Sequence, residues 1–252
     1  MTPVLFALKK MMEENRALNG LVLFGLTRQE ANIYLCLYQN GELTGYEVAK
    51  QTGISRSNVY SALAGLTDKG AAYLAQGTSS KYVAVPIEEF CDNKIRGLNQ
   101  EKEYLINNIP AMKEQEIGYI TIEGYKNIWD KVVNMVRDAD KRIYISACYH
   151  TIEQLKPELQ NVVKRGIKLV ILSDQRPQEA ELIGEITYYQ CENRGNNIRL
   201  IIDSAFALTG EITGSREDTC LYTGQKNFIN VFKDTLRNEI RLTQLQGGEK
   251  NE

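Results

Sequence analysis

The sequence predicts an α+β protein built from two different regions. Three short helical patterns and then two short strands occupy residues 21–86, whereas strands and helices alternate over residues 118–245. A charged helical linker, residues 87–117, joins the two regions. An N-terminal amphipathic helix, residues 1–20, and a flexible tail, residues 246–252, complete the predicted organisation.

The composition is typical of a soluble globular protein. Of the 252 residues, 43% are apolar and 25% are charged, and 30 basic against 32 acidic residues give a net charge of −2. No apolar run approaches the roughly 18 residues of a membrane span, and the N-terminus lacks the charge order of a secretory signal. We therefore expect a cytoplasmic protein without a membrane partner. The overall charge argues mildly against a nucleic-acid partner.

The cysteines indicate neither a disulfide frame nor a zinc site. Their number is odd, they are widely separated, and no Cys-x-x-Cys pair occurs. We expect reduced thiols, no metal and no cofactor. The five residues are Cys36, Cys91, Cys148, Cys191 and Cys220.

The first two helices of residues 21–86 are predicted by capping boxes. Thr27 precedes Glu30 by three residues, and Thr44 precedes Glu47 by the same spacing. At this spacing the threonine hydroxyl and the glutamate carboxylate each satisfy an orphan amide of the first helical turn. Both helices therefore have defined starts, and the second is so short that it must pack on its neighbours.

The third helix is expected to begin at Ser55 as its N-cap. Its apolar residues recur at the three-and-four spacing of one helix face. The opposite face carries small polar residues, Ser57 and Ser61, where a solvated helix would carry Glu and Lys. Either DNA or a neighbouring protein helix can therefore approach this face closely. Arg56 and Asn58 add two hydrogen-bonding side chains in the first turn.

Two strands, residues 71–76 and 81–85, are expected to form a hairpin after the third helix. A helix, a short helix, a turn, a third helix and a hairpin are the order of a winged helix-turn-helix domain, whose third helix enters the DNA major groove. Residues 21–86 hold only five basic residues against four acidic ones. Phosphate contacts must therefore come from a few placed side chains and helix N-termini.

The linker is predicted as a helix from Glu88 to about Glu116, with apolar residues at coiled-coil spacing if Lys102 takes one inward position. We interpret it as a dimerising linker, and the alternative is an amphipathic helix packed on its own chain. Pro110 predicts a kink or an end of the helix. The expected interface residues are Ile95, Leu98, Leu105 and Ile109, and Met112 continues the stripe.

Alternation of short strands with helices of about a dozen residues predicts a layered α/β domain with a largely parallel sheet. Ligand crevices form beyond the carboxyl ends of such strands. We expect either a small-molecule pocket lined by Tyr149, His150 and Asp174, or a capped loop with a satisfied histidine and an Asx turn. Two of the helices expected here cover residues 152–165 and 227–242.

Segments of both predicted regions carry a resemblance to a known family. The run from Ser55 to Tyr60, Ser-Arg-Ser-Asn-Val-Tyr, is followed by a Lys-Gly stop, and a weaker match covers residues 122–128 and 139–146. Over most of its length the chain resembles the TrmB-like transcriptional regulators. The resemblance implies a winged-helix DNA-binding domain, a dimerising linker, and an effector domain similar to half of a phospholipase D fold. It also implies that Arg56, Ser57, Asn58 and Tyr60 face the groove and that Lys81 lies in the wing.

The phospholipase likeness raises the alternative of a residual phosphodiesterase. That chemistry needs a histidine nucleophile and a second histidine as general acid. The strand where the motif would lie, residues 196–203, contains no histidine, and His150 is the only histidine of the chain. We therefore expect no enzymatic activity.

The sequence thus predicts a homodimeric, sequence-specific DNA-binding transcriptional regulator. Its effector would be a small molecule, a sugar or another metabolite, bound in the C-terminal domain. The alternative is a winged-helix module that binds protein instead of DNA. The expected DNA-binding residues are Thr44, Ser55, Arg56, Ser57, Asn58, Tyr60, Ser61 and Lys81.

Overall fold

The computed structural model of the chain divides into two compact units, residues 1–112 and 113–252. The residues that the structure describes are 3–75, 77, 80–110, 118–176, 186–192 and 195–248. Within these ranges, no helix is both long and apolar enough to cross a membrane. The same ranges contain no cluster of three His, Cys, Asp or Glu side chains placed to hold a metal ion.

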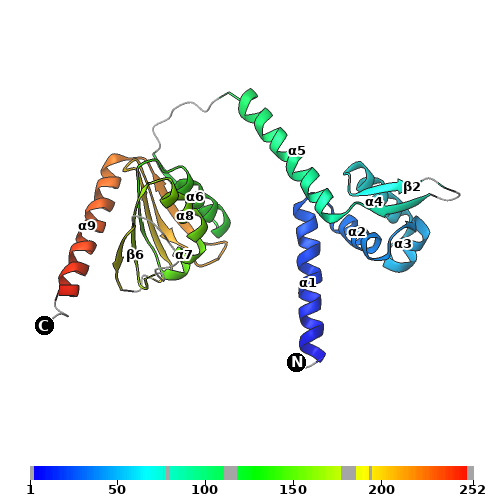
Figure 1. The fold of residues 1–252 in the computed structure, drawn as a ribbon, viewed down its shortest axis with the longest axis horizontal. Helices are drawn as coiled ribbons and strands as arrows, with labels where there is room; N and C mark the ends of the chain where they lie inside the picture. The colour runs from blue at the N-terminus through cyan, green and yellow to red at the C-terminus, as the bar shows by residue number, and fades with distance from the viewer. Residues whose placement is uncertain are drawn as a thin grey trace. The chain divides into compact units, whose positions relative to one another are not determined.

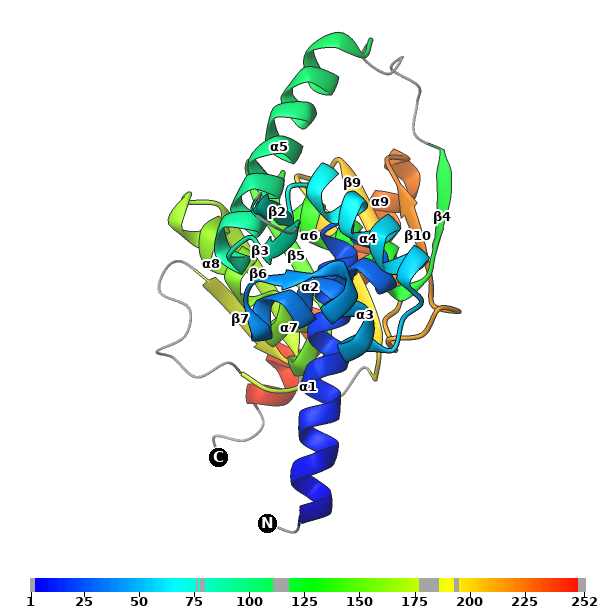
Figure 2. The same cartoon turned by 90° about the vertical axis from the view of Figure 1, so that its right-hand side faces the viewer.

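The N-terminal unit is a cluster of helices closed by a small antiparallel sheet (Figure 1). Its elements are α1 (Pro3–Leu23), α2 (Arg28–Asn40), β1 (Leu43–Thr44), α3 (Gly45–Thr52), α4 (Arg56–Asp68), β2 (Ala72–Ala75), β3 (Lys81–Ala84) and α5 (Ile87–Asn108). Strand β3 lies between β1 and β2. Helix α1 projects beyond the cluster of α2, α3 and α4 (Figures 1 and 2). The order of α2 to β3 is that of a winged helix-turn-helix domain, as predicted.

Both predicted capping boxes are confirmed. The Thr27 hydroxyl accepts a hydrogen bond from the Glu30 amide at 3.2 Å, and the Glu30 carboxylate accepts one from the Thr27 amide at 2.7 Å. Thr44 and Glu47 make the same pair of bonds at 3.3 and 2.7 Å. Helices α2 and α3 therefore begin where the sequence predicts.

The predicted N-cap of α4 has the right position, but the predicted capping hydrogen bond is wrong. Ser55 precedes the helix, but its side chain makes no capping hydrogen bond. Instead, its hydroxyl lies 3.4 Å from the hydroxyl of Ser57. The amides of the first turn of α4 are therefore left without a side-chain acceptor.

The core of the N-terminal unit includes the start of α5. Leu63 and Leu66 of α4 are fully buried, and Phe90, in the first turn of α5, is 1% exposed. Tyr34 of α2 packs on Phe90 with 5.9 Å between ring centroids, and its hydroxyl donates to the carbonyl of Val85 at 2.8 Å. Burial raises the pKa of Tyr34 to about 12. Helix α5 is thus anchored in the winged-helix domain at its N-terminal end.

Helix α5 ends at Asn108, before the predicted end near Glu116. Proline lacks an amide hydrogen and disfavours a helical conformation in the residue before it. Because of Pro110, Ile109 is extended, with φ −85° and ψ 126°, and lies just beyond the helix instead of on its stripe. Met112 lies outside the described residues.

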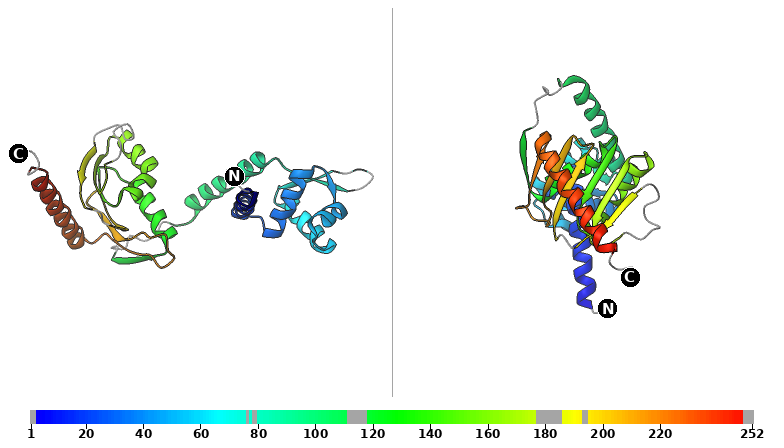
Figure 3. Two further views of the ribbon diagram at one scale, coloured as in Figure 1. Left: turned by 90° about the horizontal axis from the view of Figure 1, so that it is seen from below. Right: turned by 90° about the vertical axis from the view of Figure 1, so that its left-hand side faces the viewer.

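The C-terminal unit is a sheet with helices on both faces (Figure 1). Its elements are β4 (Tyr119–Glu123), α6 (Tyr125–Arg137), β5 (Arg142–Ser146), α7 (Tyr149–Gln154), α8 (Lys156–Lys164), β6 (Lys168–Ser173), β7 (Ile186–Gln190), β8 (Asn197–Ile202), β9 (Phe206–Glu211), β10 (Thr219–Thr223) and α9 (Lys226–Gly248). Helices α6, α7 and α8 cover one face, and α9 crosses the strands on the other (Figure 3). The predicted α/β class is confirmed.

The sheet is not largely parallel, so that part of the prediction is wrong. Over the described residues it has the strand order β4-β10-β9-β8-β5-β6-β7. The β5–β6 and β6–β7 pairs are parallel, whereas the four pairs from β4 to β5 are antiparallel. Strands β8, β9 and β10 follow one another without an intervening helix, and strands joined by short connections pair antiparallel.

Residues of β5 alternate between the two faces of the sheet. Ile143 and Ile145 are fully buried in the larger core, with α6 and α8, and Tyr144 packs on the smaller core beneath α9. Trp129 packs against the larger core and stacks on Tyr125 at 6.1 Å, so it is a core residue, as its place on an apolar stripe predicts. The unit therefore has two hydrophobic layers, one on each face of the sheet.

Two predicted helix boundaries are corrected by the structure. The helix expected over residues 152–165 is two helices, because Pro157 lies in the first turn of α8 and cannot continue α7 through its backbone amide. Helix α9 continues past the expected Leu242 to Gly248, since neither Gly nor Pro interrupts it before Gly247. Residues 246–248 of the predicted tail are thus helical, and 249–252 lie outside the described residues.

None of the five cysteines, all of which lie in the described ranges, forms a disulfide bond. Cys220 is buried and the other four are half-buried. Burial raises the pKa of the Cys220 thiol to about 11, so it packs as a small apolar side chain.

Candidate nucleic-acid interface

Five of the predicted DNA contacts lie together on the exposed side of α4. They are Arg56, Ser57, Asn58, Tyr60 and Ser61, and all five are exposed. The opposite side of the helix is buried in the domain core. Because the side chains between Arg56 and Tyr60 are short, another surface can come close to the backbone of this helix.

Arg56 stacks on an aromatic ring of the neighbouring helix. Its guanidinium carbon lies 4.6 Å from the ring centre of Tyr46 on α3, and Tyr46 is 52% exposed. Lys69 and Lys81 have carboxylate partners at 2.6 and 3.6 Å, whereas Arg56 has none among the described residues. A cation–π contact orients the guanidinium without neutralising its charge. Sequence reasoning missed Tyr46, although an aromatic residue just inside a capping box and off the apolar stripe was a usable signal.

Tyr60 sets the spacing between α3 and α4. Its ring lies against Gly45, where a Cβ atom would be 2.6 Å from Cε1 of Tyr60. Any larger residue at position 45 would displace this ring. Tyr60 is nevertheless 50% exposed, so one side of the ring supports the helix pair and the other faces outward.

The N-terminus of α4 adds a second polar feature to this surface. Since Ser55 does not cap the helix, the first-turn amides face outward with the positive end of the helix dipole. Backbone amides at a helix N-terminus bind phosphate groups favourably. The structure thus places groups suited to base edges and groups suited to phosphates on one surface.

Two of the predicted contacts already have partners. The Thr44 hydroxyl donates to the Glu47 carboxylate at 2.8 Å within the capping box. The ammonium group of Lys81 lies 3.6 Å from the Glu42 carboxylate, with both side chains more than 40% exposed. An exposed pair of this kind contributes little to stability and is easily exchanged for another anion.

A partly buried ion pair joins α2 to Lys69, the C-cap residue of α4. Glu30 of α2 is 7% exposed and accepts a hydrogen bond from Lys69 at 2.6 Å. Burial alone would raise the pKa of Glu30, but the bonds from Lys69 and Thr27 outweigh it and lower the pKa. Gly65 of α4 lies directly against the Glu30 carboxylate, so a Cβ atom at position 65 would collide with it. Gly65 therefore contacts the interior of the domain.

The three residues predicted for effector binding are placed around the start of α7. The Asp174 carboxylate accepts a hydrogen bond from the Tyr149 amide at 2.7 Å, which places a negative charge at the N-terminus of α7. His150 is exposed, and its Nε2 lies 3.1 Å from the side-chain nitrogen of Gln154, one turn along the same helix. These bonds favour the capped-loop alternative over a shared pocket.

The phospholipase-type histidine pair has no counterpart in this unit. Strand β8 and the residues that flank it contain no histidine, and His150 lies on α7. The strand carries Arg199, which pairs with Glu239 of α9 at 2.5 Å. The described residues thus provide a charged contact between the sheet and α9 in place of a nucleophile.

The fold and this surface define a winged helix-turn-helix protein with an appended α/β domain. The model of the sugar-specific transcriptional regulator TrmB matches residues 21–88, and the model of the N-terminal subdomain of the TrmB effector-binding domain matches residues 118–240. The chain belongs to the TrmB-like family of transcriptional regulators. This confirms the resemblance that the helix-turn-helix residues carry.

Two curated relatives each match about two thirds of this chain. The uncharacterized protein YrhO of Bacillus subtilis is 29% identical over 64% of this chain and 60% of its own length. The sugar-sensing transcriptional regulator TrmBL1 of Pyrococcus furiosus is 26% identical over 65% of this chain and 49% of its own length. The chain therefore spans only about half to three fifths of these relatives.

Two solved structures match the chain with TM-scores below 0.5. TrmBL2, described as an archaeal chromatin protein with a novel mode of DNA binding, is 20% identical, with a TM-score of 0.44 over 90% of this chain and 97% of its own. Nuc, a phospholipase D family member from Salmonella typhimurium, is 16% identical, with a TM-score of 0.40 over 49% of this chain and 94% of its own.

Proposed function

We propose that this protein is a transcriptional regulator that binds double-stranded DNA as a homodimer and responds to a small-molecule effector in its C-terminal unit. The observation that carries the proposal is the outer face of α4, where Arg56 stacks on Tyr46 without a carboxylate partner. The face is otherwise short and polar, which suits entry into the major groove.

Each side chain of this face has a distinct role in the proposal. Arg56 reads a guanine through its O6 and N7 atoms, and Asn58 reads an adenine. Ser57 and Ser61 let the helix approach the base edges. Phosphates bind at the N-terminus of α4 and at Lys81, which exchanges Glu42 for the DNA backbone.

A homodimer supplies the affinity that one subunit lacks. Residues 21–86 carry a net charge of only +1, so one domain gains little from counterion release. Ile95, Leu98 and Leu105 on α5 are 47, 68 and 44% exposed, which leaves an apolar stripe available to a second α5. Two linked domains reading half-sites raise the affinity without any new contact.

The proposal includes no catalytic activity, since β8 lacks a histidine. TrmBL1 is described as sugar-sensing, which supports a sugar or related metabolite as effector. The competing function is that the same α4 face binds a protein. In that case Arg56→Ala would leave the affinity for DNA unchanged.

The test is a gel-shift titration with the DNA upstream of the protein's own operon. Arg56→Ala should weaken binding by about 5- to 150-fold, because a bidentate arginine–guanine contact contributes about 1–3 kcal/mol. The control is Arg96→Ala, which removes the same charge from the exposed part of α5. Equal affinity of Arg56→Ala and wild type would refute the assignment of α4 as the recognition helix.

A further inference from the structure

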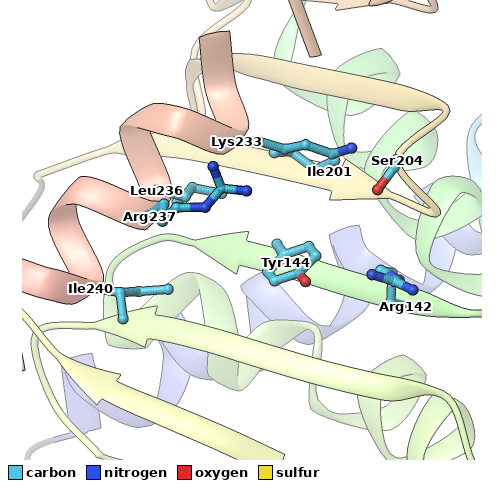
Figure 4. Close-up of a pocket in the computed structure, with 8 residues that line it drawn as sticks. All are labelled: Arg142, Tyr144, Ile201, Ser204, Lys233, Leu236, Arg237 and Ile240. Carbon is cyan, nitrogen blue, oxygen red and sulfur yellow. The ribbon is translucent and has the colours of Figure 1, made fainter. Parts of the chain in front are cut away.

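A cavity of about 260 Å³ lies within the C-terminal unit, between α9 and the sheet (Figure 4). Strands β5 and β8, with the turn after β8, form one wall, and the middle of α9 forms the other. Sites for drug-sized ligands measure about 300–1,000 Å³. The cavity is therefore of a size for a small metabolite.

The charged side chains that line the cavity are all positive. Arg142 comes from β5, and Lys233 and Arg237 come from α9, while no carboxylate lines the cavity among the described residues. Tyr144 and Ser204 add two hydroxyl groups. In Figure 4 the side chain of Lys233 extends from α9 toward Ser204.

Two of the three cations have no acidic partner within the described part of the chain. Arg237 pairs with Asp234 of the same helix at 3.0 Å, but both side chains are more than 60% exposed and the pair is weak. No carboxylate lies within ion-pair distance of Arg142 or Lys233 in the described ranges. Lys233 is half-buried, whereas Arg142 is exposed. An anion bound between Arg142 and Lys233 would supply the negative charge that neither has from a described carboxylate.

The wall of the cavity is held in an uncommon backbone conformation. Asp203 and Ser204 have φ values of 52° and 59°, in the left-handed region that L residues rarely adopt. The Asp203 carboxylate accepts hydrogen bonds from the amides of Asp140, Lys141 and Arg142 at 2.7–2.8 Å. One carboxylate thus fixes both the turn that presents Ser204 and the backbone that presents Arg142.

The rest of the lining is apolar. Ile201 and Leu236 are 1% and 3% exposed, and Ile240 lies beside them. An apolar lining beside the cations favours a ligand that has a carbon body as well as a charged group.

We propose that this cavity is an effector site for a small phosphomonoester, such as a sugar phosphate. At pH 7 a phosphomonoester carries about −1.5 to −2 charges and three acceptor oxygens, which matches two unpaired cations and two hydroxyls. The phosphate lies between Arg142 and Lys233, and the carbon body lies over Ile201 and Leu236. The regulatory meaning of the site rests on the proposed function, whereas binding itself does not.

The binding test is isothermal titration calorimetry of the full chain with two phosphomonoesters, glucose 6-phosphate and glycerol 3-phosphate. Inorganic phosphate is the third phosphorylated probe and tests the phosphate group alone. Glucose serves as the uncharged control ligand. At least one of the two phosphomonoesters should bind saturably and more tightly than inorganic phosphate, and glucose should not bind. Lys233→Gln and Arg142→Gln should each weaken that binding about tenfold or more, the scale of one lost charge-assisted hydrogen bond.

The matched control variant is Lys226→Gln, which removes the same charge from the exposed first turn of α9. It should leave the affinity unchanged, and circular dichroism should give the same unfolding midpoint for all variants within a few degrees. No saturable binding by any phosphorylated probe at 10 mM (about the weakest affinity of interest), or equal binding by wild type and the Lys233→Gln, Arg142→Gln double variant, would overturn the proposal.

A gel shift without added ligand separates the two proposals. DNA binding without anion binding would refute the proposed effector site and leave the proposed DNA-binding function standing. Anion binding without DNA binding would remove the proposed function and keep the site.

Discussion

The outer face of α4 and the cavity beneath α9 both present cations, but they are built in opposite ways. On α4 the groups come from one short stretch of one helix, residues 56–61, and they project outward with Arg56 stacked on Tyr46. Under α9 the cations come from β5 and α9, far apart in the sequence, and they line a cavity. The first arrangement suits a large partner that comes to the protein, and the second suits a small one that enters it.

The net charge of a segment does not predict the charge of a site within it. Residues 1–86 hold eight basic and six acidic residues, whereas the remainder holds 22 and 26. The more acidic part nevertheless contains the cavity whose charged lining is entirely cationic. Local sign depends on which side chains the fold brings together, and distant charges are screened within about 10 Å at 0.1 M salt.

The largest predicted effect is on DNA affinity, which should depend on the dimer, whereas phosphate binding in the C-terminal unit should not. Leu98→Glu places a charge in the centre of the α5 stripe, and it should convert the protein to a monomer by analytical ultracentrifugation. DNA affinity should then fall by about 10²- to 10⁴-fold, the usual gain from linking two binding modules. Phosphate binding in the C-terminal unit should be unchanged.

Gln100→Glu is the matched control for the dimer, since residue 100 lies on the other side of α5 and is also exposed. It should remain dimeric. If Leu98→Glu is also dimeric, the interface lies elsewhere, and the dependence of the α4 face on a second copy loses its structural basis.

An intermediate effect concerns the scaffold under the α4 face. Gly65→Ala should destabilise the N-terminal unit by about 1–3 kcal/mol, because the added methyl group collides with Glu30 and disturbs its buried bond to Lys69. The measurement is urea unfolding followed by far-UV circular dichroism.

Gly97→Ala provides the control for this change. Gly97 lies in α5 with open space around it, so alanine should stabilise the helix by about 0.5–1 kcal/mol. Similar unfolding midpoints for the two variants would mean that α4 does not depend on the Gly65 contact.

The smallest effect tests the wall of the cavity. Burial by itself would raise the pKa of Asp203, but hydrogen bonds from the amides of Asp140, Arg142 and Lys141 outweigh it and lower the pKa below its ordinary value. A carboxylate with a lowered folded-state pKa stabilises the fold above its unfolded pKa, and this contribution is lost as the pH falls through the folded pKa. Asp203→Asn keeps a residue that tolerates positive φ and removes the charge.

The variant should therefore be about 1 kcal/mol less stable than wild type at pH 7, and the difference should shrink below about pH 4. Glu217→Gln, an exposed site in the same unit, should show little difference at either pH. A constant difference between Asp203→Asn and wild type from pH 7 to pH 2.5 would contradict a role for the charge.

Local signals predicted much of the N-terminal unit. The capping boxes at Thr27 and Thr44 involve bonds between residues three apart, so they do not depend on the rest of the fold. Pro110 stops α5 for an equally local reason. Ser55 has the residue type of a cap, but its hydroxyl lies near that of Ser57, a choice of rotamer that residue type does not predict.

The C-terminal unit shows where local reasoning ends. The sequence predicts alternating strands and helices there, but its prediction of a largely parallel sheet is wrong, because pairing depends on how each connection crosses the sheet. Tyr149, His150 and Asp174 were grouped by their place after strands, and the structure gives them capping and intrahelical bonds. The cavity residues were missed altogether.

The sequence by itself determined the order of the elements, the exposed composition of α4 and the absence of a histidine pair, because each depends on residue type and spacing along one segment. The tertiary structure decided that Tyr46 orients Arg56, that Gly65 faces Glu30, and that Arg142 and Lys233 share a cavity. These contacts join residues from different elements. Their distances depend on how helices pack on helices and on the sheet, which no local spacing encodes.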